Sequence, residues 1–120
     1  MIIAVGCDHG GFSLKQAVLE AITELGHEFI DFGVDEATRV DFPDYARPVC
    51  EAVLSGKAER GIAICGSGIG MNIAVNKFIG IYGSVCHDTY SAHQGVEHDN
   101  MNVLCLGARV VGDELAKDIV

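Results

Sequence analysis

The sequence predicts an α/β fold in which five parallel strands form one sheet covered by helices on both faces. Short β-prone apolar runs alternate with segments whose apolar residues recur at helical spacing. The strand-like runs are apolar almost throughout, as in strands buried on both faces of a parallel sheet. Polar residues gather directly after these runs, where parallel α/β sheets bind their ligands.

The first strand is expected at residues 2–6. Apolar residues at helical spacing then predict a helix over residues 14–25, and Gly26 ends it because glycine readily adopts the left-handed conformation that follows many helices. A second strand follows at residues 28–32.

The second helix is expected to begin at Asp44, whose carboxylate can cap it, so that Pro48 falls in the first turn, where a missing N–H costs little. Ser55 and Gly56 end this helix. The third strand covers residues 61–64 and leads into a loop of alternate glycines that begins the third helix.

The rest of the chain continues the alternation, with a strand at 79–86, a helix at 89–95, a strand at 103–106 and a helix from Gly112 onward. This last helix is expected to be incomplete, because its pattern is still running at Val120. We therefore expect one domain over residues 1–120.

Composition excludes several classes of function. The 120 residues are 49% hydrophobic, enough for the core of a single domain. The net charge of −9 argues against a general affinity for nucleic acid or acidic membranes, and no apolar run could span a bilayer. Five cysteines without C-x-x-C pairs argue against a disulfide framework or a zinc site and indicate free thiols in the cytoplasm.

The most informative stretch is residues 65–77, where Cys65 is followed by Gly66, Gly68 and Gly70. Glycines let backbone N–H groups approach an anion, and a helix start adds positive charge, so a thiol here is a candidate base or nucleophile. The spacing does not match a dinucleotide-binding loop, a Walker loop or a nucleophile elbow. A plain strand-to-helix turn is the alternative.

Two further polar clusters are candidates for chemistry. Asp8 and His9 follow the first strand in a glycine-rich segment, and His98 precedes the fifth strand. Histidine can carry a proton or bind an anion near neutral pH. A capping aspartate with an incidental histidine and a solvated loop histidine are the structural alternatives. No histidine spacing matches a metal-binding motif, so no metal is expected.

In this order, the clusters resemble the ribose-5-phosphate isomerase B family, which includes galactose-6-phosphate isomerase subunits. The resemblance covers essentially all 120 residues, and residues 65–77 are its most specific part. Cys65 with Met71 matches the cysteine-dependent branch of the family. The other matching stretches are residues 6–11, 14–15, 31–33, 41–46, 98–104 and 106–112.

The resemblance implies a Rossmann-like three-layer α/β/α domain that forms homodimers or tetramers with active sites between subunits. It implies an aldose–ketose isomerase that needs no cofactor and acts through an enediolate, with ribose 5-phosphate and ribulose 5-phosphate as the expected pair. The same chemistry on allose or galactose 6-phosphate is an alternative, which pocket width near Phe42 and near the Asp8-His9 loop would decide. A non-catalytic sugar-phosphate-binding subunit is another.

By the same resemblance, Cys65 is the base that moves a proton between C2 and C1, and His98 of the partner subunit opens the sugar ring. Ser67 and the glycine loop donate to the enediolate oxygen, and Asp8 aids proton traffic. The residues expected to contact substrate are Asp8, His9, Gly66, Ser67, Gly68, Ile69, Gly70, Asp99 and Arg109.

Three departures from the family pattern stand out. Asp99 replaces a usual asparagine, whose amide can donate a hydrogen bond where a carboxylate only accepts. Phe42 replaces a common tyrosine and Tyr82 a common arginine, which we expect to alter packing or substrate preference. The family also usually continues beyond the position of Val120, with arginines that grip the substrate phosphate.

Overall fold

The computed structural model describes residues 1–36 and 39–120. Its strands are β1 (Ile2–Cys7), β2 (Glu28–Asp31), β3 (Arg60–Cys65), β4 (Gly83–Val85) and β5 (Val103–Gly107). Its helices are α1 (Phe12–Glu24), α2 (Pro43–Leu54), α3 (Ile69–Val75), α4 (Thr89–His98) and α5 (Asp113–Ile119). No helix in these described ranges is long and apolar enough to cross a membrane.

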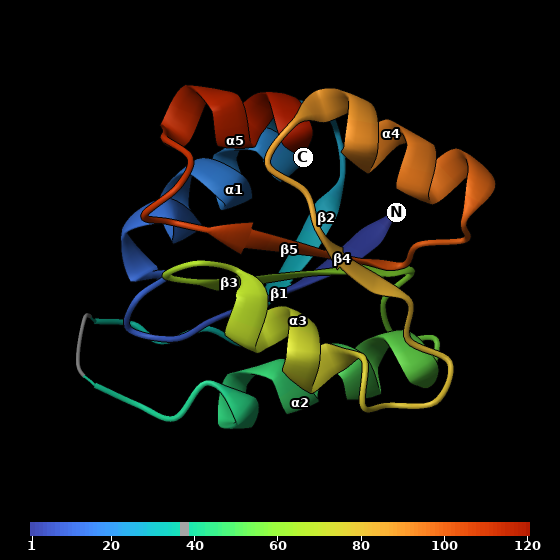
Figure 1. Ribbon diagram of the computed structural model, residues 1–120, viewed down its shortest axis with the longest axis horizontal. Coiled ribbons are helices and arrows are strands. Elements are labelled where there is room, and N and C mark those ends of the chain that lie inside the picture. Colours follow the sequence, from blue (N-terminus) through green and yellow to red (C-terminus); the bar gives the residue numbers. More distant parts are fainter. Residues whose placement is uncertain (37–38) are drawn as a thin grey trace.

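All five strands run parallel in one sheet, in the order β2-β1-β3-β5-β4. Helices α1, α4 and α5 cover one face, and α2 and α3 cover the other (Figure 1). The predicted α/β fold with a five-stranded parallel sheet is therefore confirmed.

The sheet separates two apolar cores, because its central strands are covered on both faces. The core under α1 and α5 includes Val5, Val18, Ile22, Ile64 and Leu106. The core under α2 and α3 includes Cys50, Ala63, Met71, Val75 and Cys105. This double burial explains why the strands read as apolar runs rather than as alternating patterns.

The register brings the carboxyl ends of three strands to one edge of the sheet. Cys7 pairs with Ile64, and Cys65 pairs with Gly107. The chain leaves β1 toward β2 on one side, whereas β3 lies on the other side. Such a change of direction opens a crevice at the strand ends, which is where open α/β sheets bind ligands.

The predicted fourth strand at 79–86 was too long. Gly80 has φ +94°, which makes a turn, and the Asn102 side chain binds the surrounding backbone. Its Oδ1 accepts the Tyr82 N–H at 2.8 Å and its Nδ2 donates to the Gly80 carbonyl at 3.0 Å. Because a side chain takes these groups, regular pairing is limited to β4.

The outer edge of β4 is also held by a side chain. Gly83 lies on this edge strand, and its N–H donates to Asn76 Oδ1 at 2.9 Å. The Asn76 Nδ2 donates back to the Gly83 carbonyl, also at 2.9 Å. The side-chain amide of Asn76 therefore fixes β4 to the end of α3.

Several helix boundaries also differ from the prediction; helix α1, for example, covers Phe12–Glu24 instead of residues 14–25. Helix α2 begins at Pro43, so Asp44 lies in its first turn instead of capping it, and Pro48 lies inside the helix. Proline suits the first helical position because its φ is preset and no N–H partner is needed there. Helix α4 extends to His98 instead of ending at residue 95, so this histidine lies at a helix end.

Candidate active site

A cleft of about 390 Å³ opens at the carboxyl ends of the central strands. The structure brings most of the predicted site residues together there. The lining consists of Asp8, His9, Gly10, Phe42, Cys65, Gly66, Ser67, Gly70, Arg109 and Val110.

Cys65 ends β3 and is 6% exposed. Its sulfur accepts the backbone N–H of Gly68 at 3.0 Å. Gly68 has φ +82°, a conformation that residues with side chains rarely adopt, and it turns the chain into α3. An N–H aimed at the sulfur stabilises negative charge there, as a thiolate base requires.

The other four cysteines are unsuited to act as a base near neutral pH. Burial raises the pKa of Cys7 and of Cys50 to about 11. Burial likewise raises the pKa of Cys86 and of Cys105. None of these four thiols lines the cleft, so Cys65 is the cysteine available to a bound molecule.

Asp8 and His9 project from the segment after β1. Asp8 is 7% exposed, and its Oδ1 accepts the Gly11 N–H at 3.0 Å, which fixes the carboxylate. The Nδ1 atom of His9 accepts the Val40 N–H at 3.1 Å. A neutral ring that accepts at Nδ1 carries its hydrogen on Nε2, so Nε2 is the donor that His9 has left for a ligand.

The two glycine-rich segments meet at Gly10 and Gly66. A Cβ atom on Gly10 would lie 3.0 Å from the Gly66 nitrogen and 3.3 Å from Asp8 Oδ1. These distances are tighter than ordinary van der Waals contact. The absence of a side chain at Gly10 therefore lets the β1 and β3 loops share one cleft.

The turn after β5 holds the glycine loop from the other side. The Ala108 N–H donates to the Cys65 carbonyl at 2.9 Å, and the Arg109 N–H donates to the Gly66 carbonyl at 3.0 Å. The Arg109 guanidinium lies over Gly66, with Nη1 3.3 Å from where a Gly66 Cβ would stand.

The charge of Arg109 is open to an anionic ligand. Within residues 1–36 and 39–120, the ion pairs involve Lys15, Lys117, His93 and His98 but not Arg109. Arg109 is therefore a local cation in a chain whose net charge is −9. A guanidinium offers several N–H donors in a fork that matches phosphate and carboxylate oxygens.

Three lining residues were not among the predicted contacts: Gly10, Phe42 and Val110. The Phe42 ring packs on Gly70, with a ring carbon 3.4 Å from where a Gly70 Cβ would stand. Gly10 and Phe42 both lie in stretches that carried the family resemblance, which was a usable signal. Val110 likewise lies in a matching stretch, residues 106–112, next to Arg109.

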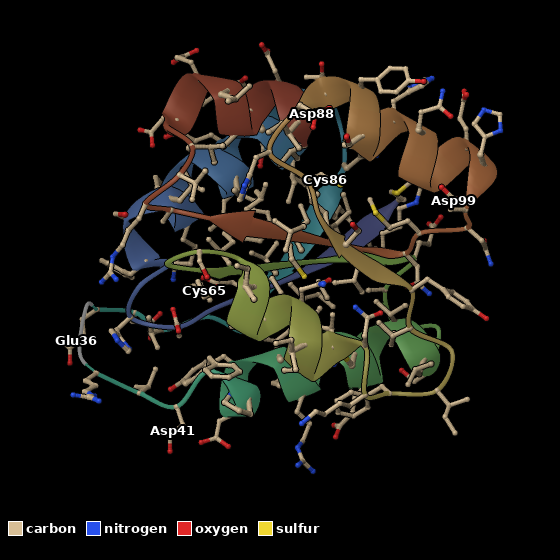
Figure 2. All side chains as sticks on the ribbon, in the orientation of Figure 1. Glu36, Asp41, Cys65, Cys86, Asp88 and Asp99 are labelled. Carbon is tan, nitrogen blue, oxygen red and sulfur yellow. The ribbon has the colours of Figure 1, made fainter. Side chains whose placement is uncertain are left out.

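His98 and Asp99 do not lie in this cleft. They lie at the end of α4, before the start of β5, whereas the cleft lies beyond the end of β5. Figure 2 shows Asp99 and Cys65 on opposite sides of the molecule. The His98 side chain is 63% exposed, with Nε2 3.8 Å from Glu97 Oε2. One chain alone therefore does not bring His98 to Cys65.

Gly68 and Ile69 belong to the glycine loop without lining the cleft. Gly68 contributes its N–H to the Cys65 sulfur. The Ile69 N–H donates to Ser67 Oγ at 3.2 Å, while its side chain is 58% exposed. Ser67 thus accepts one hydrogen bond from the loop and keeps its own O–H free to orient toward a ligand.

A larger cavity, of about 810 Å³, lies at the opposite end of the sheet. It is bordered by the start of β1 and β5 and by residues of α1, α4 and α5, and none of the predicted site residues lines it. In the part of the chain that the structure describes, no group of three or more His, Cys, Asp or Glu could hold a metal ion. The chemistry-bearing residues are therefore concentrated in the smaller cleft.

Comparisons with known proteins show which family the chain resembles. The family profile described as Ribose/Galactose Isomerase matches residues 3–120. Ribose-5-phosphate isomerase B of Escherichia coli is 50% identical over 118 residues, which are 98% of this chain and 79% of that protein. D-erythrulose-4-phosphate isomerase of Pectobacterium atrosepticum is 41% identical over 119 residues, which are 98% of this chain and 78% of that protein.

Solved structures show the same likeness. The structure of Clostridium thermocellum ribose-5-phosphate isomerase B has a TM-score of 0.96 and 48% sequence identity. The match covers 99% of this chain and 80% of that one. Sequence and fold therefore point to the same group of proteins.

Proposed function

The chain belongs to the ribose/galactose isomerase family, and from that premise we propose that it interconverts ribose 5-phosphate and ribulose 5-phosphate. It is a sugar-phosphate isomerase, and thus an intramolecular oxidoreductase. The observation that carries the finer proposal is the Cys65 sulfur in the cleft, with an N–H donor at 3.0 Å. The five free cysteines fit a reducing compartment, and we place the enzyme in the cytoplasm.

In the proposed reaction, the Cys65 thiolate takes the proton from C2 of the open-chain aldose. The electron pair left on C2 forms a double bond to C1, and the carbonyl electrons move to O1 as negative charge. The Ser67 hydroxyl and N–H groups of the glycine loop stabilise this oxygen. Cys65 then returns the proton to C1 while the carbonyl forms at C2.

One more proton must pass between the two oxygens, and we assign it to Asp8. The carboxylate takes the O2 hydroxyl proton and delivers it to O1. Its Oδ1 is held by the Gly11 N–H at 3.0 Å, so the carboxylate is fixed in the cleft that Cys65 also lines. Arg109 and the Nε2–H of His9 are proposed to bind the substrate phosphate, because both are cleft residues that donate hydrogen bonds.

Ring opening breaks the bond between C1 and the ring oxygen, and we propose that His98 of a second copy takes the O1 hydroxyl proton and gives a proton to the ring oxygen, in a homodimer with shared sites. The support is that His98 ends α4 before the start of β5, whereas Cys65 pairs with Gly107 at the other end of that strand. Cys65→Ser and His98→Ala subunits should each be inactive alone. Mixing them in equal amounts should restore about a quarter of wild-type activity, because about half of the dimers are then mixed and each mixed dimer has one of its two sites intact. Failure of dissociated and reassociated subunits to complement would contradict a shared site.

The central test is the isomerisation of ribose 5-phosphate by the wild-type chain and by Cys65→Ser. The variant should lose turnover and keep its circular dichroism spectrum. Cys50→Ala is the matched control, because Cys50 is a buried cysteine of α2 outside the cleft, and it should stay active. Turnover by Cys65→Ser near the wild-type rate would remove Cys65 as the base.

The size of the sugar is the second question that the site raises. A four-carbon substrate has support from the Pectobacterium relative, which is named for D-erythrulose 4-phosphate. The Phe42 ring packed on Gly70 walls the cleft, which favours the shorter sugars over allose or galactose 6-phosphate. Comparing kcat/KM for four-, five- and six-carbon sugar phosphates tests this order. Binding without turnover of any of them would favour the binding-subunit alternative.

A further inference from the structure

The geometry points to His87 as a positioning residue of this site, an inference that rests on the proposed function for its activity readout. His87 follows β4, is half-buried and does not line the cleft. Its Nε2 accepts the backbone N–H of Gly107, the last residue of β5, at 3.1 Å. The imidazole can therefore influence the site through the backbone of β5, without lining the cleft itself.

His87 occupies the place of a missing strand carbonyl. Between β4 and β5, the Val103 N–H donates to the Tyr82 carbonyl, and the Cys86 N–H donates to the Cys105 carbonyl. The alternation of a parallel ladder would next pair the Gly107 N–H with the Cys86 carbonyl. The His87 ring accepts that N–H instead, and so extends the ladder by one hydrogen bond after β4 has ended.

Gly107 is the point at which the sheet meets the glycine loop. A Cβ on Gly107 would lie 2.6 Å from the Ser67 carbonyl carbon, so the two backbones are in direct contact. The next two N–H groups, of Ala108 and Arg109, hold the carbonyls of Cys65 and Gly66. Fixing Gly107 therefore fixes both the Arg109 backbone and the loop that follows Cys65.

The hydrogen bond also defines the state of the ring. To accept at Nε2, a neutral imidazole carries its hydrogen on Nδ1. An imidazolium has donors at both nitrogens and makes no such bond. His87 thus works as an acceptor, and its role is to orient Arg109 and the loop rather than to exchange protons with the substrate.

The test compares His87→Leu, which removes the acceptor, with His87→Gln, whose side-chain oxygen can reach Gly107. His87→Leu should raise KM for ribose 5-phosphate about tenfold and lower kcat less than about threefold, because a lost hydrogen bond misplaces a binding group. His87→Gln should restore most of the wild-type KM. If His87→Leu keeps the wild-type KM and only a smaller fraction of the protein is folded, His87 has a structural role alone and the inference is wrong.

The matched control is His27→Leu. His27 also accepts a hydrogen bond at a ring nitrogen, 3.0 Å from the N-terminal ammonium, but it lies beside the larger cavity at the other end of the sheet. This variant should leave KM unchanged. A KM rise equal to that of His87→Leu would show a general effect of losing a histidine and would overturn the inference.

Nitrogen-15 NMR of the wild-type protein tests the hydrogen bond without any activity. His87 should show an unprotonated Nε2 and a protonated Nδ1, and the Gly107 amide signal should shift in His87→Leu and return in His87→Gln. A protonated Nε2 would overturn the inference even if the enzyme is active. Absence of wild-type turnover would refute the proposed function instead, while the NMR result would still decide the role of His87.

Discussion

Replacing Lys15 by methionine tests how the segment after β2 is held. Lys15 lies in α1 and is 8% exposed. Its Nζ donates to the Val34 carbonyl at 2.6 Å and lies 3.0 Å from Asp31 Oδ2. The other oxygen of Asp31 accepts the Gly33 N–H at 2.8 Å. One ammonium group thus ties the end of β2 and the following residues to α1.

The expected cost follows from these contacts. Methionine keeps most of the aliphatic stem, so little cavity forms. A hydrogen bond from a charged donor contributes about 1.5–3 kcal/mol, and breaking a fully buried ion pair costs about 3–5 kcal/mol. The Asp31 side chain is 25% exposed and regains water, which reduces the second figure. We expect the free energy of unfolding to fall by about 2–3 kcal/mol.

Urea unfolding at one fixed protein concentration measures this change. The midpoint should fall while the m value stays constant, and Tm should drop by roughly 6–12 °C. Lys117→Met is the matched control, because Lys117 pairs with Glu20 at 3.3 Å on the surface. Exposed pairs contribute little, so this control should unfold near the wild-type midpoint. A loss below about 1 kcal/mol for Lys15→Met, or equal losses in both variants, would refute the reasoning.

Four further predictions concern the site, pH and metal. Gly68→Ala should destabilise the fold by about 1–2 kcal/mol, because φ is +82°, and should lower kcat by moving the N–H that meets the Cys65 sulfur; urea unfolding and steady-state kinetics check both. Unfolding free energy should fall as pH rises from 9.0 to about 11. Burial raises the pKa of Cys7 and of Cys50 in the folded protein from 9.0 to about 11. Their contribution to the free energy of unfolding is therefore complete below pH 9.0 and is lost as the pH rises to about 11. A flat urea midpoint between these pH values would contradict it. Asp99→Asn should raise kcat/KM if the carboxylate repels the enediolate in a shared site, whereas a decrease would give the carboxylate a role of its own. EDTA should leave turnover unchanged, and strong inhibition that added metal reverses would refute the metal-free mechanism.

The fold could be predicted because local and global signals agree in the central strands. Residues of β1, β3 and β5 are apolar on both faces, and each run is followed by a turn and a helical period. The errors arose where local rules competed. Both Pro43 and Asp44 can start a helix, and the structure uses the proline. The length of the edge strand was overestimated because the Asn102 side chain takes a backbone group that regular strand pairing would use. This hydrogen bond joins Asn102 to Tyr82, 20 residues earlier in the chain.

Much of the candidate site could also be predicted, because Asp8 follows β1 and Cys65 ends β3, and the carboxyl ends of parallel strands are where such sheets bind ligands. Long-range hydrogen bonds could not. The bond from the Val40 N–H to His9 spans 31 positions, and that from the Gly107 N–H to His87 spans 20. Such pairs depend on how the loops lie after the sheet has formed, and no spacing rule describes them.

The amide of Asn76 has a consequence for the behaviour of the protein in concentrated solution. An edge strand normally offers unpaired N–H and C=O groups, which can recruit a strand from another molecule and seed aggregation. At Gly83 both groups are already occupied by one asparagine side chain. A foreign strand would have to displace two hydrogen bonds before it could add to the sheet here. Asn76 thus protects the β4 edge of the sheet, at Gly83, against the addition of a strand from another molecule.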